Sequence, residues 1–189
     1  MNRILTVLVS FLSVGPAFAL DAEDVLRIWA SQEGRWHGHI DIYTAASDGP
    51  TTVRLLSSWD ATPDGTRLTR IETFVSEQGE NSSVTVMYAD PDTGHIVTPY
   101  FAAGPQRDYR FAVISGEITD DTHWTTVIAS PDGQEQYEGR PAVLRYVRTR
   151  TGDTLVSTKE VDFLDDNEDA FEMRSYIEQT LTTGTQTRK

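Results

Sequence analysis

The segment SSVTVMYADPDTGHIVTPYFA, residues 82–102, carries the pattern that decides the fold of this chain. Its two halves, 82–89 and 95–102, are rich in β-branched and aromatic side chains, which favour strands. The sequence DPDTG at 90–94 separates them. Because proline presets φ and glycine accepts the positive φ of a tight turn, the segment predicts a β-hairpin.

The same alternation of strand-like segments and turns continues on both sides of this hairpin. Turns are indicated by DGP at 48–50, PDG at 63–65 and 131–133, and TGD at 151–153. Consecutive strands with short connections and no crossover helix predict an antiparallel meander, and closure into a barrel removes its edges. We therefore predict an all-β fold, an antiparallel up-and-down barrel of about ten strands. The expected strands are residues 35–45, 52–61, 66–77, 82–89, 95–102, 107–115, 122–129, 135–148, 154–163 and 169–181.

One short helix is expected before the first strand. The sequence DAED at 21–24 offers an N-cap with acidic residues in the first turn, and the apolar-rich segment 25–29 follows. Gly34 can take the left-handed conformation that ends a helix. We predict a single domain over residues 20–182 and a disordered polar tail at 183–189.

The first residues have the features of an export signal. Arg3 precedes an apolar run at 4–14, and residues 15–19 (GPAFA) add a turn breaker and a small-x-small cleavage site. The run is too short to cross a bilayer, so no membrane anchor is expected. We predict a signal peptide at residues 1–19, cleaved after Ala19, and a periplasmic or secreted mature protein.

The composition restricts the partners of the protein. The chain has no cysteine, which excludes disulfides and a lipid anchor on cysteine and favours a prokaryotic envelope. It has 16 basic and 29 acidic residues, a net charge of −13, and loss of Arg3 makes the mature chain still more acidic. An acidic surface repels phosphate backbones, so we expect no nucleic-acid partner. The sequence does not determine the oligomeric state.

Gly34, Trp36 and Gly38 lie where the expected helix meets the first strand. This arrangement resembles the Gly-x-Trp signature of the lipocalin and fatty-acid-binding-protein group, the calycins. It is similar in particular to bacterial lipocalin-like domains of unknown function and to their nitrobindin-like relatives. Residues 88–94 and 171–176 resemble the mid-chain hairpin and closing strand of those families, and the resemblance covers about residues 22–181.

The resemblance implies structural roles for four residues at the base of the barrel. Trp36 is expected to plug the closed end, with Gly34 before it and Gly38 allowing the strand to bend. Arg174, on the last strand, is expected to pack over the ring of Trp36.

Histidine placement argues against a haem or metal cofactor. Nitrobindin-like proteins bind haem through a histidine on a late strand, but the last histidine here is His123. His37 and His39 share one face of a strand with Asp41 and could chelate a metal in principle. If Trp36 points inward, all three point outward, so we expect a solvated surface there.

Charged residues alternate with apolar ones inside several expected strands, and barrels that hold an amphipathic ligand combine these two kinds of side chain. We predict a cavity in which an arginine meets a carboxylate or a similar head group. The alternative is that Arg70 and its neighbours form cross-strand pairs on the outer surface. The predicted ligand-binding residues are Arg70, Glu72, Tyr88, Phe111, Trp124, Tyr146 and Tyr176.

These observations favour non-enzymatic binding of a small apolar or amphipathic molecule by an exported barrel. The sequence has no Gly-x-Ser-x-Gly motif, no phosphate-binding glycine loop and no cysteine nucleophile. Two alternatives remain open. One is a protein-interaction or inhibitor module on a filled barrel, and the other is a small isomerase or hydrolase that uses cavity carboxylates such as Glu72 or Glu160.

Overall fold

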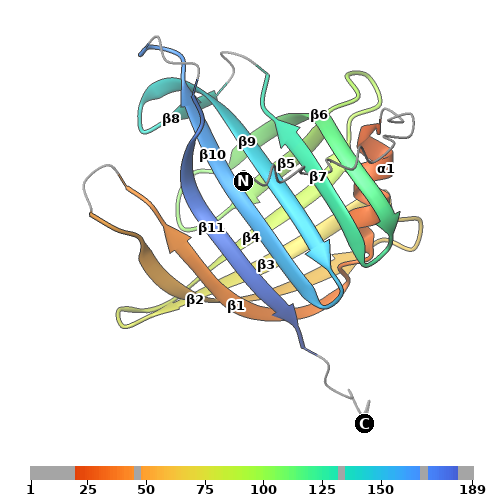
Figure 1. The fold of residues 1–189 in the computed structure, drawn as a ribbon, viewed down its shortest axis with the longest axis horizontal. Coiled ribbons are helices and arrows are strands. Elements are labelled where there is room, and N and C mark those ends of the chain that lie inside the picture. The colour runs from red at the N-terminus through yellow and green to blue at the C-terminus, as the bar shows by residue number, and fades with distance from the viewer. Residues whose placement is uncertain (1–19, 45–47, 132–134, 167–169, 183–189) are drawn as a thin grey trace, which may run out of the picture.

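The computed structural model describes residues 20–44, 48–131, 135–166 and 170–182. They form one helix and eleven strands (Figure 1). The elements are α1 (Ala22–Ala30), β1 (Gly34–Ile42), β2 (Thr51–Ala61), β3 (Arg67–Ser76), β4 (Gly79–Ala89), β5 (Ile96–Phe101), β6 (Arg107–Asp120), β7 (His123–Ala129), β8 (Glu135–Tyr137), β9 (Arg140–Thr151), β10 (Thr154–Phe163) and β11 (Glu172–Leu181).

The strands close into an antiparallel barrel. Neighbours follow the order β10-β11-β1-β2-β3-β4-β5-β6-β7-β9, and β9 pairs with β10 to complete the ring. The short β8 pairs with β9 outside this ring. The predicted fold class, an up-and-down barrel of about ten strands with one N-terminal helix, is confirmed.

Two strand boundaries differ from the prediction. The expected strand 135–148 is a hairpin of β8 and β9, because Glu138 and Gly139 both take positive φ, at 53° and 79°, and reverse the chain. Glutamate rarely adopts this conformation, so Gly139 was the single indication of a turn there. The expected strand 107–115 continues to Asp120, and its pairing with β7 shifts register between Val113 and Ser115.

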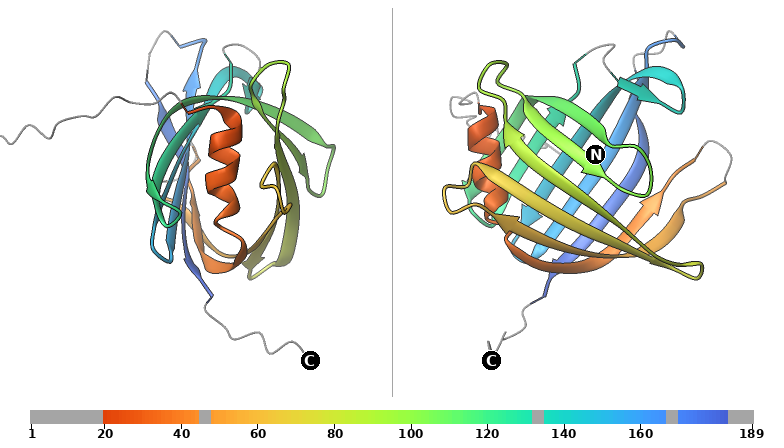
Figure 2. Two further views of the ribbon diagram at one scale, coloured as in Figure 1. Left: turned by 90° about the vertical axis from the view of Figure 1, so that its right-hand side faces the viewer. Right: turned by 180° about the vertical axis from the view of Figure 1, so that it is seen from behind.

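Helix α1 lies across one end of the barrel (Figure 2, left). Its N-cap Asp21 accepts a hydrogen bond from the backbone nitrogen of Asp24 at 2.8 Å. The buried face of the helix packs into the barrel end. Burial of each of its large apolar side chains contributes about 1.5–3 kcal/mol to the free energy of unfolding. These side chains are Val25, Leu26, Ile28 and Trp29. The helix therefore closes the barrel at this end.

Trp36 lies in the closed end, as the resemblance implied. It is 1% exposed, and its indole Nε1 donates a hydrogen bond to the backbone oxygen of Gln32 at 2.8 Å. The expected partner was wrong: Arg150, not Arg174, lies over the Trp36 ring, with Cζ at 5.4 Å from the ring centre. Trp36 pairs with Leu181, so Arg174 is seven residues, about 23 Å, further along β11. There it lies 5.2 Å from the centre of the Phe163 ring.

The two glycines of this region have separate steric reasons. Gly34 has φ of +132°, which favours glycine at the start of β1. A side chain at Gly38 would overlap the backbone oxygen of Glu178 on β11. Gly38 thus permits a close approach of β1 and β11.

Residues 1–19 and 183–189 lie outside the described part of the chain, so the signal peptide and the disordered tail stay predictions. Within the described part, α1 is too short to span a membrane, and no other helix is present.

Candidate functional site

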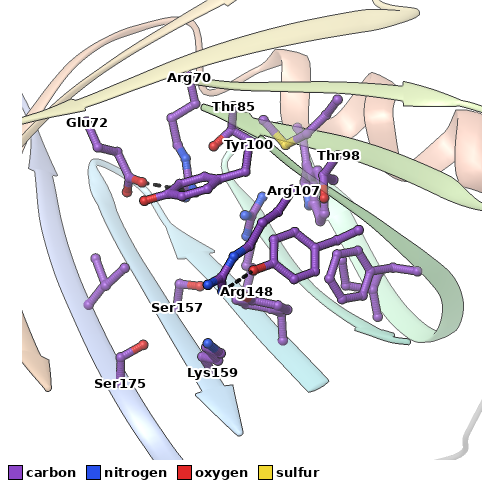
Figure 3. Close-up of a pocket in the computed structure, with 17 residues that line it drawn as sticks. Arg70, Glu72, Thr85, Thr98, Tyr100, Arg107, Arg148, Ser157, Lys159 and Ser175 are labelled. Carbon is purple, nitrogen blue, oxygen red and sulfur yellow. Dashed lines mark hydrogen bonds and ion pairs between the residues drawn. The ribbon is translucent and has the colours of Figure 1, made fainter. Parts of the chain in front are cut away.

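A cavity of about 300 Å³ lies inside the barrel (Figure 3). It is lined by Trp29 of α1 and by side chains of β3 to β7 and β9 to β11. Because alternate residues of a strand point to the same face, the lining follows a two-residue period, as with Tyr146 and Arg148 on β9. The volume is at the lower end of the range of small-molecule sites, about 300–1,000 Å³.

Apolar and aromatic side chains form part of the wall. The ring of Phe111 lies 6.2 Å from that of Tyr109 and meets the ring of Tyr146 edge-on at 5.3 Å. Met87 and Ile128 also line the cavity. This part of the wall can cover an apolar molecule.

Trp29 connects the cavity to the closed end of the barrel. Its side chain is 1% exposed, and its Nε1 donates a hydrogen bond to Thr126 Oγ1 at 3.0 Å. This bond fixes the orientation of the indole ring. The helix thus contributes a rigid aromatic surface to the cavity.

The charge of the cavity is opposite to that of the chain. Among the described residues, four cationic side chains and one carboxylate line it, in a protein of net charge −13. The carboxylate is Glu72, and the cations are Arg70, Arg107, Arg148 and Lys159 (Figure 3). The positive charge of the cavity therefore favours the binding of a negatively charged group.

Arg70 and Glu72 neutralise each other. Arg70 Nη2 lies 3.1 Å from Glu72 Oε2, and the side chains are 16% and 5% exposed. The guanidinium of Arg70 also lies over the ring of Trp59, at 5.3 Å. This ion pair is part of the wall.

Arg148 has no such partner. The residue is 6% exposed, and its Nε and Nη1 have no hydrogen-bond acceptor among the described residues. Its guanidinium carbon lies 4.2 Å from the ring centre of Trp29 and 5.4 Å from that of Trp59. Burial, reinforced by the charge of Arg70, lowers the pKa of Arg148 to about 9, so its side chain is still charged at neutral pH.

Lys159 and Arg107 supply the other positive charges. Burial, reinforced by Arg107, lowers the pKa of Lys159 to about 8, and its Nζ lies 4.2 Å from the centre of the Tyr137 ring. Arg107 is exposed and donates a hydrogen bond to Tyr109 Oη at 3.4 Å. The cavity therefore extends from solvent at Arg107 to the buried Arg148.

Four of the seven predicted ligand-binding residues line the cavity: Arg70, Glu72, Phe111 and Tyr146. The alternative that Arg70 and Glu72 form a pair on the outer surface is wrong, since their pair lies inside the barrel. No ligand contact tests these residues, so their role in binding stays a prediction.

Three predicted residues are not in the lining. Tyr88 follows Met87, which points into the cavity, so Tyr88 points outward. The hydroxyl of Tyr176 donates a hydrogen bond to Glu178 Oε2 at 2.8 Å on the outer face.

Trp124 is buried, but it lies in the hydrophobic core on β7. It pairs with Arg150, one layer beyond Arg148 toward the closed end. It is therefore too deep to line the cavity.

Sequence reasoning missed Arg107, Arg148 and Lys159 as lining residues. The segment RYVRTR at 145–150 has arginines on both faces of a strand, so charge alone did not show which ones point inward. The available signal was parity: Arg148 is two residues from Tyr146 and so shares its face.

Of the two carboxylates named for the alternative of a small enzyme, Glu72 lines the cavity and Glu160 does not. Glu160 pairs with Arg145, and neither residue lines the cavity. No histidine is among the described lining residues, so the site does not fit haem held by a histidine. His39 Nε2 lies 3.9 Å from Asp41 Oδ2 on β1, away from the cavity.

Comparisons with known proteins support the fold. No family model and no curated protein matches the sequence. A solved structure that is similar is the crystal structure of Rv2717c from M. tuberculosis, with a TM-score of 0.60 and 10% identity. The match covers 85% of this chain and 99% of that chain. At this identity the likeness shows a shared barrel fold, which fits a calycin-like barrel.

Proposed function

We propose that this protein binds a small amphipathic molecule inside its barrel, without catalysing a reaction. The observation that carries the proposal is one cavity with an aromatic wall and buried charged groups. Apolar walls with a few placed polar groups are the usual construction of small-molecule sites. The cavity also argues against the filled barrel that a purely surface-binding module would have.

The wall is built to keep its shape. The ring of Phe111 contacts those of Tyr109 and Tyr146, and Trp29 is fixed by its hydrogen bond to Thr126. A preformed wall reduces the entropy lost on binding. This supports binding rather than collapse of the barrel onto itself.

We also propose that binding takes place after export. The proposal rests on the sequence of residues 1–19. The intact mass of the protein purified from its own cells is expected to match a chain that begins at Leu20. A mass that retains residues 1–19 would contradict export by cleavage.

The binding proposal is tested with N-phenyl-1-naphthylamine, a neutral probe whose fluorescence rises in apolar surroundings. We expect saturable binding to the wild-type protein. Thr98 lines the cavity, so Thr98→Phe fills it and should weaken binding about tenfold or more. Thr73→Phe is the matched control, since Thr73 bonds to Ser82 at the exposed outer face of β3 and β4.

Thermal unfolding shows whether both variants remain folded. If folded Thr98→Phe binds the probe as the wild type does, the barrel interior is not the site. If neither the neutral probe nor the acids described below bind at all, the proposed function is wrong.

A further inference from the structure

Two arginines on β9 differ sharply although they point to the same face. Arg150 Nε donates to the backbone oxygen of Gly152 at 3.0 Å, and its Nη1 donates to the backbone oxygen of Ser31 at 2.5 Å. Arg148 is as deeply buried, at 6% exposed against 5%, yet its Nε and Nη1 have no acceptor among the described residues. Of these two arginines, Arg148 lines the cavity and Arg150 does not.

A buried guanidinium without an acceptor is costly, because the lost hydration is not replaced. The other buried arginine outside this pair, Arg174, has the carboxylate of Glu172 at 2.6 Å. Arg148 lies against the rings of Trp29 and Trp59, which interact with the cation through their faces. Such stacking leaves the N–H edges of a guanidinium available for a planar acceptor.

The described part of the chain supplies no such acceptor in the cavity. Glu72 is the one carboxylate of the described lining; it forms its ion pair with Arg70, and its charge favours the charged form of Arg148 without a hydrogen bond between them. Thr85 Oγ1, which also lines the cavity, is buried without a partner too. A hydroxyl and a guanidinium that both lack partners in one cavity suit an oxyanion.

The part of the cavity nearer to solvent is also positively charged. Arg107 is exposed, and it lies close enough to Lys159, opposite Tyr146 in the β9–β10 pairing, for the two charges to interact. Glu135 lies close enough to both cations, and Glu138 to Lys159, to oppose part of their charge. Arg148 itself is further inside, opposite Ser157 in the β9–β10 pairing.

We infer that the bound molecule carries a carboxylate or phosphate group, which pairs with Arg148 deep in the barrel while its apolar part lies along Phe111 and Tyr146. This inference rests on the proposed function and specifies its ligand class. The ion pair of Arg70 with Glu72 is the model for this contact. In the proposal, the anionic group of the ligand pairs with Arg148 as Glu72 pairs with Arg70.

The test compares two probes of the same shape by calorimetry at pH 7 and low salt. The probes are 2-naphthoate, an anion, and 2-naphthamide, its neutral analogue. A charge-assisted bond to Arg148 should make 2-naphthoate bind about tenfold to a hundredfold more tightly. The third arm, 2-naphthyl phosphate, shows whether the site prefers a carboxylate or a phosphate.

The variant Arg148→Met should remove this preference, so that 2-naphthoate binds about as weakly as the amide. Affinity for the amide should change less than about twofold. Arg35→Met, on the exposed outer face of β1, makes the same charge change and should leave both affinities as in the wild type. Arg148→Lys retains the charge without the planar fork and should give an intermediate affinity for the acid.

The outcomes separate the two proposals. Equal binding of acid and amide by the wild type contradicts the anion inference and leaves amphipathic binding standing. A preference for the acid that survives in folded Arg148→Met also contradicts it, because the anion then pairs elsewhere. If the methionine variant does not fold, the affinity of Arg148→Lys for the acid tests Arg148 in its place, and a wild-type affinity in that variant would contradict the inference.

Discussion

The closed end of the barrel and its middle layer both place an arginine beside a tryptophan, but the two arginines differ in their hydrogen bonding. At the closed end, Arg150 lies over Trp36 and donates hydrogen bonds to backbone oxygens of the two turns beside it. In the middle layer, Arg148 lies against Trp29 and has Nε and Nη1 without acceptors among the described residues. A single residue, Thr149, separates the structural Arg150 from Arg148, which has no acceptor for these two groups.

This difference distinguishes residues that stabilise the fold from residues that are available for binding. Polar groups that hold a fold are satisfied by the fold itself, because an unsatisfied buried group destabilises it. An unsatisfied buried cation that persists in a cavity is a feature of binding sites. Four substitutions or conditions test the division, from the largest expected effect to the smallest.

Gly38→Ala should damage the closed end most. The added methyl group would overlap the backbone oxygen of Glu178, and neither strand can move without breaking the pairing of β1 with β11. We expect the free energy of unfolding to fall by more than about 4 kcal/mol, or no folded protein to form. Urea unfolding followed by tryptophan fluorescence measures this; a loss below about 1 kcal/mol would show that the strands are not held closely there.

Arg150→Met should be the next most damaging. It removes hydrogen bonds to Gly152 and Ser31 and leaves their partly buried oxygens without this donor. The expected loss in unfolding free energy is about 3 kcal/mol. The same urea experiment applies, and a variant as stable as the wild type would mean that Arg150 does not hold the closed end.

The pH dependence of stability tests the unpaired cations. The pKa of Lys159 is about 8 in the folded protein, below its ordinary value, so the unfolded chain binds more protons above pH 8. Stability should therefore rise between about pH 8 and 10.5, by about 2 kcal/mol from this group. Arg107 and Arg174 favour the neutral lysine, while Glu135 and Glu138 oppose it.

Lys159→Met isolates that contribution. The difference in unfolding free energy between wild type and variant should change across this pH window, since only the wild type has the lysine. Parallel stability curves would contradict a lowered pKa of Lys159 in the folded protein. Binding of 2-naphthoate should weaken above about pH 8, where Lys159 loses its proton, and further above about pH 9, the pKa of Arg148.

Arg148→Met should have the smallest effect on stability, and in the opposite direction to Arg150→Met. Replacing an unpaired buried charge by an apolar side chain should leave the unfolding free energy unchanged or raise it by about 1 kcal/mol. The lost contact with Trp29 offsets part of this gain. A fall of about 2 kcal/mol or more, measured in urea, would show that Arg148 serves the fold as Arg150 does.

The sequence predicted the fold well because its signals were local. Turn sequences such as PDG at 63–65 and the alternation within strands are set by residues next to each other. The exceptions also have local causes. Glu138 takes a positive φ that glutamate rarely adopts, and so Gly139 alone was too weak a signal for the β8–β9 turn.

The site was harder to predict because it depends on which face of each strand points inward. Tyr88 was assigned to the wrong face of β4, and Tyr176 to the wrong face of β11, whose pairing with β10 shifts between Lys159 and Glu160. Arg174 was given a partner seven residues away along the barrel. To avoid such errors one must know how distant strands pair, and a single sequence does not contain that information.

The most direct test of the central claim is a crystal structure of the protein with 2-naphthoate. We expect the carboxylate within hydrogen-bonding distance of Nε or Nη1 of Arg148, with the naphthalene ring beside Phe111. A naphthoate bound outside the barrel, or paired with Arg70 in place of Glu72 while Arg148 has no contact with it, would contradict the claim.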